Sequence, residues 1–368
     1  MPRPLPSPAI APVRRAGAGR AASLADVASL AGVSTGTVSR ALSKPEMISE
    51  ATRTRVLQAA ERLGYVANGA ARALAMRRTM TIGAIVPRFG SSSFPALVQA
   101  LEARLAAAGY TLLLSAPDPR PANASAVLRA LLGRGVDAVA LLGAEQPPVV
   151  FATLAAHAIP YVLMWAPPQS AAHCIGFDEA RAATLVVDHL FGLGHRRVGY
   201  IGAPGAGSER ARRRLHDITH AIAQRGMTLC GDALLETEHG FREGFEAMQA
   251  ILHGKAQLTA VICGSDYLAA GALSALDQAG VKVPQQLSVA SFNDNAFAPF
   301  VHPPLTTVQL PIREIGERAG EVLIARLRGD ALPAHDALPV RLRARASTGP
   351  APTDTTPAVT RKPRRTTP

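Results

Sequence analysis

The pattern of apolar and polar positions changes once along the chain. Between residues 23 and 66, apolar residues recur at intervals of three and four, which is typical of short amphipathic helices. From residue 79 to residue 348, short apolar runs alternate with amphipathic stretches, as in parallel α/β domains. The pattern therefore predicts a small helical unit followed by a large α/β unit.

Three helices are predicted in the N-terminal unit. Serine hydroxyls can cap the free amides at a helix start. The predicted starts of the three helices have such serines, which are Ser23, Ser34 and Ser49. At the first helix, Asp26 can complete a reciprocal capping pair with Ser23. The second helix, 35–42, follows the first after a tight turn. This is a helix-turn-helix, in which one helix braces another that fits a DNA major groove. The residues expected to be buried are Val27, Leu30, Ala31, Val56, Leu57, Ala60 and Leu63.

The large unit is predicted to form two α/β lobes, because about 270 residues are many for a single core. The lobe boundary is expected at 166–170, where Pro167 and Pro168 interrupt the pattern. Strands are expected at 81–87, 111–116, 137–143, 161–165, 197–203, 260–264 and 287–292. Helices are expected at 95–109, 179–194, 209–226, 242–253 and 266–280.

The positive charge is concentrated at the two ends of the chain. The net charge is +12, and residues 1–78 contain 12 Lys and Arg against 4 Asp and Glu, whereas residues 79–348 contain 23 against 22. Such a concentration on a small N-terminal unit is typical of nucleic-acid binding. Residues 1–22 and 349–368 are expected to be disordered basic tails that account for part of the charge.

The composition favours a globular cytoplasmic protein. Hydrophobic residues make up 48% of the chain and charged residues 18%, which permits a sizeable core. No apolar run reaches the roughly 18 residues of a membrane span, and residues 1–22 make a poor signal peptide. Cys174, Cys230 and Cys263 have neither metal-site spacing nor the number for a disulfide framework. We therefore expect no membrane association, no metal and no cofactor.

Four stretches of the N-terminal unit resemble the headpiece of the LacI family of transcription regulators. They are LADVASLAGVS (24–34), TVSRAL (37–42), ISEATRTRV (48–56) and LGYVAN (63–68). The resemblance continues more weakly to residue 348. It implies a helix-turn-helix domain at 23–66, a hinge helix at 67–78, and at 79–348 a two-lobed effector-binding and dimerisation domain similar to periplasmic binding proteins.

The resemblance implies DNA contacts on the second helix. Thr35, Gly36 and Arg40 match positions that face base edges, and Arg40 can offer a bidentate fork to guanine. A phosphate clamp is the alternative role for Arg40. Ser34, Thr37 and Ser39 have hydroxyl groups suited to contacting phosphates. Tyr65 and Asn68 match family positions that anchor the headpiece to the DNA backbone.

Residues 68–75 resemble the hinge helix of the family, which is too short to be stable alone. In the family two such helices, one per subunit, pair in the minor groove. Leu74 matches the wedge that opens a central base step, although an ordinary apolar contact is the alternative, and Arg72 is available for a phosphate. The resemblance therefore implies a homodimer on a palindromic double-stranded operator.

Polar and aromatic residues after the strands are candidates for an effector cleft between the lobes. Arg210 and Arg214 share a helix face, and Arg214 matches a family arginine that holds the effector, whereas Arg212 and Arg213 are expected on a solvated face. The alternative role for Asp178 is to cap the following helix, and the alternative role for Trp165 is simple packing. The candidates are Ser92, Ser93, Phe94, Trp165, Asp178, Arg210, Arg214, Asn293 and Asp294.

The effector is expected to be a small sugar-like molecule. The stretches FND (292–294) and HPPLTTV (302–308) look most like gluconate-type repressors. Asn293 stands where the family usually has an aspartate, and losing that carboxylate reduces repulsion of an acid. With the arginines, this suggests a sugar acid such as gluconate.

Rival functions have less support. The glycine-rich stretch 202–207 lacks the lysine that a phosphate loop needs, and spacing alone indicates no metal or catalytic constellation, so we do not expect an enzyme. A ligand carrier is disfavoured by the basic headpiece. Activation stays open as an alternative to repression, whereas the large effector body argues against a nucleoid-type role. The sequence thus predicts a repressor of a catabolic operon under allosteric control by an effector.

Overall fold

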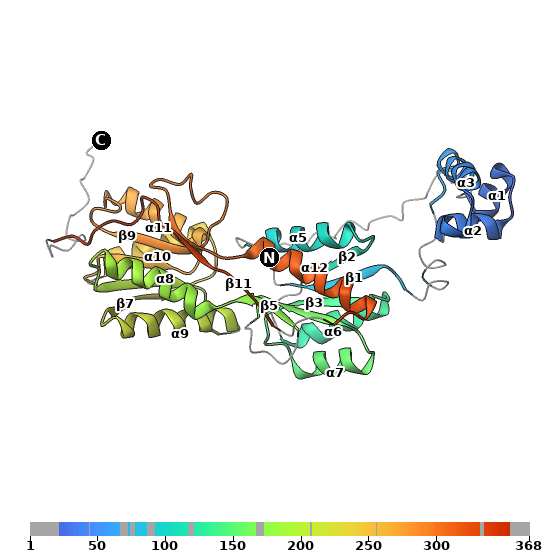
Figure 1. Cartoon of the computed structure of the whole chain (residues 1–368). Coiled ribbons are helices and arrows are strands. Elements are labelled where there is room, and N and C mark those ends of the chain that lie inside the picture. Colours follow the sequence, from blue (N-terminus) through green and yellow to red (C-terminus); the bar gives the residue numbers. More distant parts are fainter. Residues whose placement is uncertain are drawn as a thin grey trace, which may run out of the picture. The chain divides into compact units, whose positions relative to one another are not determined.

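The computed structural model describes residues 22–43, 45–66, 73, 78–86, 93–116, 121–166, 173–206, 208–254, 256–331 and 335–353. The chain divides into two compact units, residues 1–79 and 80–368 (Figure 1). The predicted arm at 1–21, most of the predicted hinge, and the tail from residue 354 lie outside the described residues, as do Asn68, Arg72, Leu74 and Ser92.

The N-terminal unit consists of three α-helices and a short 3₁₀ helix. They are α1 (Leu24–Ala31), α2 (Thr35–Ser43), η1 (Pro45–Met47) and α3 (Glu50–Arg62). The predicted caps are confirmed at Ser23, which forms a capping box with Asp26, and at Ser49, whose side chain accepts from the Thr52 amide. The chain leaves α1 through Gly32 at φ 64°, a left-handed conformation that glycine adopts without strain.

The core of this unit is narrower than the sequence predicted. Its buried residues are Val27, Ala28, Ala31, Val38, Ala41, Val56, Ala59 and Ala60. Leu30, Leu57 and Leu63 were expected to be buried, but they are 45%, 43% and 37% exposed. Small alanine side chains form the contacts between these short helices. The larger leucines lie beside those contacts on each helix and are partly exposed to solvent.

The second unit contains two six-stranded sheets with the same strand order. The first sheet runs β11-β5-β4-β3-β1-β2 and the second runs β12-β10-β9-β8-β6-β7. The first consists of β1 (Thr81–Ile85), β2 (Thr111–Ser115), β3 (Ala138–Leu142), β4 (Tyr161–Met164), β5 (Cys174–Phe177) and β11 (His335–Leu338). The second consists of β6 (Arg197–Gly202), β7 (Thr228–Glu236), β8 (Ala260–Cys263), β9 (Ser288–Asn293), β10 (Thr306–Gln309) and β12 (Arg341–Arg343). All pairs are parallel except β10 with β12, which differs from the all-parallel expectation.

Helices cover both faces of each sheet (Figure 1). In the first lobe these are α5 (Phe94–Ala106), α6 (Pro121–Gly133), α7 (Pro148–Ala156) and α12 (Ile312–Arg328). In the second they are α8 (Glu179–Gly192), α9 (Glu209–Gln224), α10 (Phe241–His253) and α11 (Asp266–Gln278). Helix α12 packs on α5, where a Cβ at Gly316 would lie 2.2 Å from the Leu97 carbonyl oxygen, so glycine permits the close approach.

The chain crosses between the lobes three times. It leaves the first lobe after β5, returns after β10 to form α12 and β11, and leaves again to form β12. The predicted boundary at 166–170 is therefore wrong, because β5 follows it and still belongs to the first sheet. Pro167 and Pro168 themselves lie outside the described residues.

The ordered body extends beyond residue 348. The Gly349 amide donates to Ser288 Oγ (3.1 Å) and the Ala351 amide donates to the Leu193 carbonyl oxygen (2.8 Å). Residues 349–351 are thus held on the second lobe, which corrects the prediction that a disordered tail begins at 349. In the described ranges, no helix is long and apolar enough to cross a membrane.

Candidate functional site

Helix α2 presents one polar face to solvent. Val38 and Ala41 point into the core and are 0% and 3% exposed, and this fixes the opposite face of the helix. Most of the residues predicted to contact DNA are exposed there, with Thr37 half-buried: Ser34, Thr35, Gly36, Thr37, Ser39 and Arg40. A short helix with a buried apolar side and an exposed polar side has the geometry for groove reading.

The start of α2 is held by side-chain hydrogen bonds. The Thr37 amide donates to Ser34 Oγ (3.1 Å), and the two hydroxyls of these residues are 2.9 Å apart. The Arg40 guanidinium lies over Gly36, since a Cβ there would be 3.8 Å from Arg40 Nη2. Tyr65 is half-buried and packs on the core of the unit, which gives it a structural contact as well as the predicted anchoring role.

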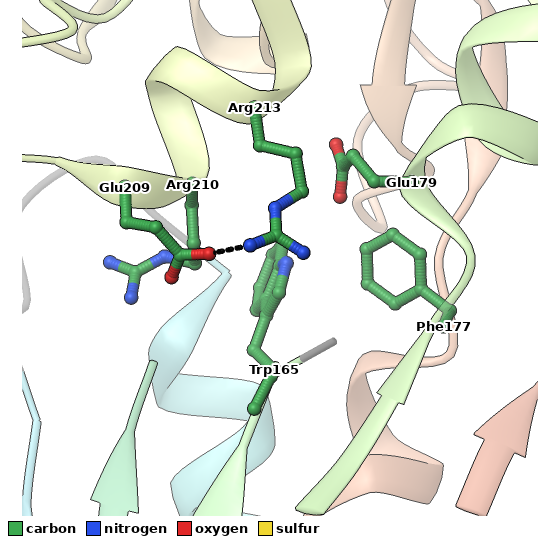
Figure 2. A pocket seen from close by; sticks show the side chains of 7 residues that line it. Trp165, Phe177, Glu179, Glu209, Arg210 and Arg213 are labelled. Atoms are coloured by element: carbon green, nitrogen blue, oxygen red, sulfur yellow. Dashed lines mark hydrogen bonds and ion pairs between the residues drawn. The ribbon is translucent and has the colours of Figure 1, made fainter. Parts of the chain in front are cut away.

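A small, partly open pocket lies between the two lobes of the second unit. Figure 2 shows Trp165 in the middle of its lining, with Arg213, Glu179 and Phe177 around it. The first lobe contributes residues that end β4 and β5, and the second contributes the starts of α8 and α9. The lining residues are Trp165, Ala166, Phe177, Glu179, Glu209, Arg210 and Arg213.

Arg214 forms a buried ion pair beside this pocket. Its Nε donates to Glu179 Oε1 (2.5 Å), its Nη1 donates to the Gly264 carbonyl oxygen (2.8 Å), and its guanidinium lies 4.6 Å from the Phe292 ring centre. Both charged side chains are at most 10% exposed. Removing one partner of a buried pair typically costs about 3–5 kcal/mol, so this pair fixes α8 and α9 relative to each other.

Arg210 points toward the first lobe. Its guanidinium lies 5.3 Å from the Phe94 ring centre, and a Cβ at Gly143 would lie 2.9 Å from its Nη1. Burial, and after it the repulsion by Arg214, lower the pKa of Arg210 to about 10, against the attraction of Glu209 and Glu179. Arg210 therefore remains charged at neutral pH in a site that destabilises its charge.

Arg212 is exposed, as the sequence predicted, whereas Arg213 is half-buried. Arg213 lines the pocket and forms an ion pair with Glu209 one turn earlier on α9. Arg212 reaches the first lobe, where its Nη2 lies 2.5 Å from Glu145 Oε2. Only side-chain directions reveal this difference, because neighbouring arginines look alike in sequence.

Three predicted effector residues have structural partners. Asp178 caps α8, since its Oδ1 accepts from the Arg181 amide (2.9 Å). The Asp294 carboxylate lies 2.6 Å from Arg345 Nη2, and Arg343 Nε lies 3.9 Å from it. Ser93 Oγ donates to Asn295 Oδ1 (3.0 Å) and so joins the two lobes. These contacts give each residue a role that does not depend on an effector.

The chain matches two family models at its two ends. Residues 23–68 match the bacterial regulatory proteins of the lacI family, and residues 187–348 match the periplasmic binding protein-like domain. The chain belongs to the LacI family. It is 32% identical over 308 residues to the ribose operon repressor of Escherichia coli, covering 83% of this chain and 93% of that protein. It is 30% identical over 309 residues to the transcriptional repressor PurR of Photobacterium profundum, with 83% and 92% covered.

The fold is similar to that of solved LacI-family structures. A structure of the lac repressor dimer bound to operator and an anti-inducer superposes with a TM-score of 0.81 at 26% identity, covering 90% of this chain and 100% of that one. The transcription regulator GntR from Chromobacterium violaceum superposes with a TM-score of 0.70 at 29% identity, with 73% and 99% covered. The expected fold, a helix-turn-helix unit followed by a two-lobed periplasmic-binding-protein-like unit, is thereby confirmed.

Several side chains near the cleft of this LacI-family chain were not predicted from the sequence. Glu179 and Phe177 line the pocket, and His239 lies near Ser265, with 3.3 Å between Nδ1 and Oγ. Burial, then Arg214 and Arg210, lower the pKa of His239 to about 4, so this imidazole is neutral at pH 7. The position of Glu179 at a helix start, two residues after the end of a strand, was a usable signal. In the described part of the chain, no three His, Cys, Asp or Glu side chains gather as a metal site would require.

Proposed function

We propose that this protein is a sequence-specific repressor whose affinity for a palindromic operator is controlled by a small sugar-like effector. The observation that carries the proposal is the exposed polar face of α2, opposite the buried Val38 and Ala41, in a chain of the LacI family. The relatives cited above are themselves named as repressors, which disfavours an enzyme. With DNA as its partner, the protein would act in the cytoplasm.

The proposed DNA contacts follow from the exposure of α2. Arg40 reads a guanine by a bidentate contact, and Thr35 reads a neighbouring base, while Gly36 allows close approach. The hydroxyls of Ser34, Thr37 and Ser39 position phosphates. Tyr65 and Asn68 anchor the unit on the backbone.

The proposed hinge spans residues 67–78 and requires two chains. Leu74 enters a central base step, and Arg72 contacts a phosphate. The lac repressor to which this fold is similar was solved as a dimer bound to operator, which supports a homodimer here. An aromatic surface on the second lobe is a candidate dimer face: Phe241, Tyr267 and Phe297 contact one another with ring centres 5.0–5.7 Å apart, and Phe300 is 85% exposed nearby in sequence.

The proposed effector site is the cleft between the lobes. Phe94 and Trp165 offer aromatic faces, and Arg210, Arg214 and Asn293 offer polar groups from the second lobe. Ser92, Ser93, Asp178 and Asp294 complete the candidate set. The finer proposal is a sugar acid such as gluconate. Solved relatives include a complex of the transcriptional regulator CelR with cellobiose, so a neutral sugar is the competitor to test.

The proposed control is a shift between two lobe arrangements. An effector can change operator affinity only if it binds the two arrangements with different affinity. Contacts such as Ser93 with Asn295 and Arg212 with Glu145 exist in one arrangement and must break if the lobes separate. The effector thereby biases the pairing of the two hinges.

The deciding experiment is selection of bound DNA from a random pool with the full-length protein. We expect an inverted repeat to be enriched, and we expect fluorescence anisotropy to show that preference persisting at salt concentrations where non-specific binding fades. Equal affinity for the selected and scrambled sequences at all salt concentrations would refute a sequence-specific repressor.

A further inference from the structure

The arginine cluster at the start of α9 contains a single arginine without a carboxylate partner. Arg212 pairs with Glu145, Arg213 with Glu209 and Arg214 with Glu179. Among the described residues, neither an ion pair nor a hydrogen bond joins Arg210 to an acceptor, and its close contact is the Phe94 ring. A guanidinium in a cleft with this environment is an anion receptor.

Charged side chains of both signs gather around the pocket. Arg213 and Arg214 are paired with Glu209 and Glu179, and Asp217 also interacts electrostatically with Arg213. Arg212 and Glu145 cancel each other, and His239 is neutral at pH 7 because its pKa is lowered to about 4. The neighbouring arginines therefore have their negative partners already, and a bound carboxylate would supply one to Arg210.

Two buried polar atoms lack hydrogen-bond partners in the described part of the chain, and both lie at the ends of strands of the large unit. They are Trp165 Nε1, a donor, and Asn293 Oδ1, an acceptor. Trp165 lines the pocket, with its ring packed against Phe94 and Phe177 at 5.8 and 5.6 Å between ring centres (Figure 2). An unsatisfied buried polar group costs about 1–3 kcal/mol, and a bound ligand with matching groups removes that cost.

We propose that Arg210 is the residue that selects a carboxylate-bearing polyhydroxy effector, with Trp165 Nε1–H donating to an effector oxygen and Asn293 Oδ1 accepting from an effector hydroxyl. Arg214 is then a positioning residue, because its guanidinium is already occupied by Glu179 and the Gly264 carbonyl. Gly143 leaves the space that the Arg210 guanidinium needs. This proposal rests on the proposed effector-controlled repressor and names the chemistry that its cleft reads.

The test is calorimetric titration of the full-length protein with matched acid and neutral pairs. The pairs are gluconate with glucitol, glucuronate with glucose, galacturonate with galactose and ribonate with ribitol, and glucose 6-phosphate is included as a different anion. We expect at least one acid to bind about tenfold or more tightly than its neutral partner. The Arg210→Gln variant should lose that preference and bind the neutral partner unchanged, while Arg210→Lys should restore part of it.

The matched control is Arg225→Gln, which removes one charge at the far end of α9, where Arg225 pairs with Asp188 on the surface. It should keep the acid preference. Retention of the preference by Arg210→Gln, a neutral sugar that binds best, tighter binding of the sugar phosphate than of every acid, or no binding of any acid each overturns the proposal. Operator binding by the same preparation separates these outcomes from failure of the repressor function itself.

Discussion

Arg212 on α9 and Glu145 after β3 bridge the two lobes, with 2.5 Å between Nη2 and Oε2. The hydrogen bond to Glu145 raises the pKa of Arg212, so this guanidinium is charged at neutral pH. Both side chains are about half exposed. The ion pair therefore stabilises the present arrangement of the two lobes around the pocket only weakly and in a salt-sensitive way.

Replacement of Glu145 by Gln should weaken effector binding at most a few-fold, because exposed ion pairs contribute little. The loss should be larger at low salt than at high salt, since mobile ions screen the pair. Calorimetry with the best ligand at two salt concentrations measures both effects. Glu102→Gln, an exposed substitution of the same charge on α5, is the control. A salt-independent loss would contradict an electrostatic fastening.

Replacement of Arg40 by Gln should reduce affinity for the selected operator by about 1–3 kcal/mol through loss of one guanine contact. The discrimination at one base position should disappear with it. Anisotropy titrations on the operator and on single-base variants provide the measurement, with Arg225→Gln as a charge-matched control outside the N-terminal unit. An equal loss on every sequence would assign Arg40 to a phosphate instead.

Replacement of Leu74 by Ala should lower operator affinity by about tenfold or more, because the wedge that holds the kinked base step is removed. Effector binding and the dimer should be unchanged, as calorimetry and sedimentation would report. Leu114→Ala, a partly exposed leucine on β2, is the matched control. Unaltered operator affinity in the Leu74 variant would refute the wedge.

Acid should destabilise the second lobe through His195. This imidazole is 0% exposed; its Nε2–H donates to the Gly349 carbonyl oxygen (3.0 Å), and its Nδ1 accepts from Thr259 Oγ1 (2.8 Å). Burial, the largest cause, lowers the pKa of His195 below 6.5. The unfolded chain therefore binds the proton first, so the stabilisation is present above pH 6.5 and is lost as pH falls through the lower folded-state value.

Urea unfolding followed by Trp165 fluorescence at pH 7.5 and 5.5 tests this dependence. His195→Gln should be less stable at pH 7.5 and should show a smaller difference between the two pH values. The exposed His253 on α10 provides the control His253→Gln, which should keep the full pH dependence. An unchanged difference in the His195 variant would mean that another group causes the acid sensitivity.

Local signals in the sequence predicted most individual elements. Serines with capping side chains mark helix starts, as Ser23 and Ser49 do. Continuous apolar runs mark buried strands such as β3 and β8. These features act over a few residues, so a linear pattern contains them. The strands β5, β7, β10, β11 and β12 were not predicted, and the pairing partners of β11 and β12 lie far away in the chain.

The candidate site was predictable in its location and less so in its detail. The arginine cluster at 210–214 was recognised, but which arginine is paired depends on carboxylates from Glu145, Glu179 and Glu209, two of them distant in sequence. The same holds for Asp294, whose partner Arg345 follows 51 residues later. Side-chain direction and long-range pairing are tertiary properties that spacing does not encode.

The three crossings between the lobes limit how parts of this protein can be exchanged by recombination or by engineering. Neither lobe is encoded by one uninterrupted stretch, because the first is assembled from the segments that carry β1–β5 and from a later one that carries α12 and β11. A single recombination point inside the body therefore cannot exchange one lobe for that of a relative. The N-terminal unit is contiguous and can be exchanged in one step, so new operator specificity is accessible to gene fusion in a way that a new half-cleft is not.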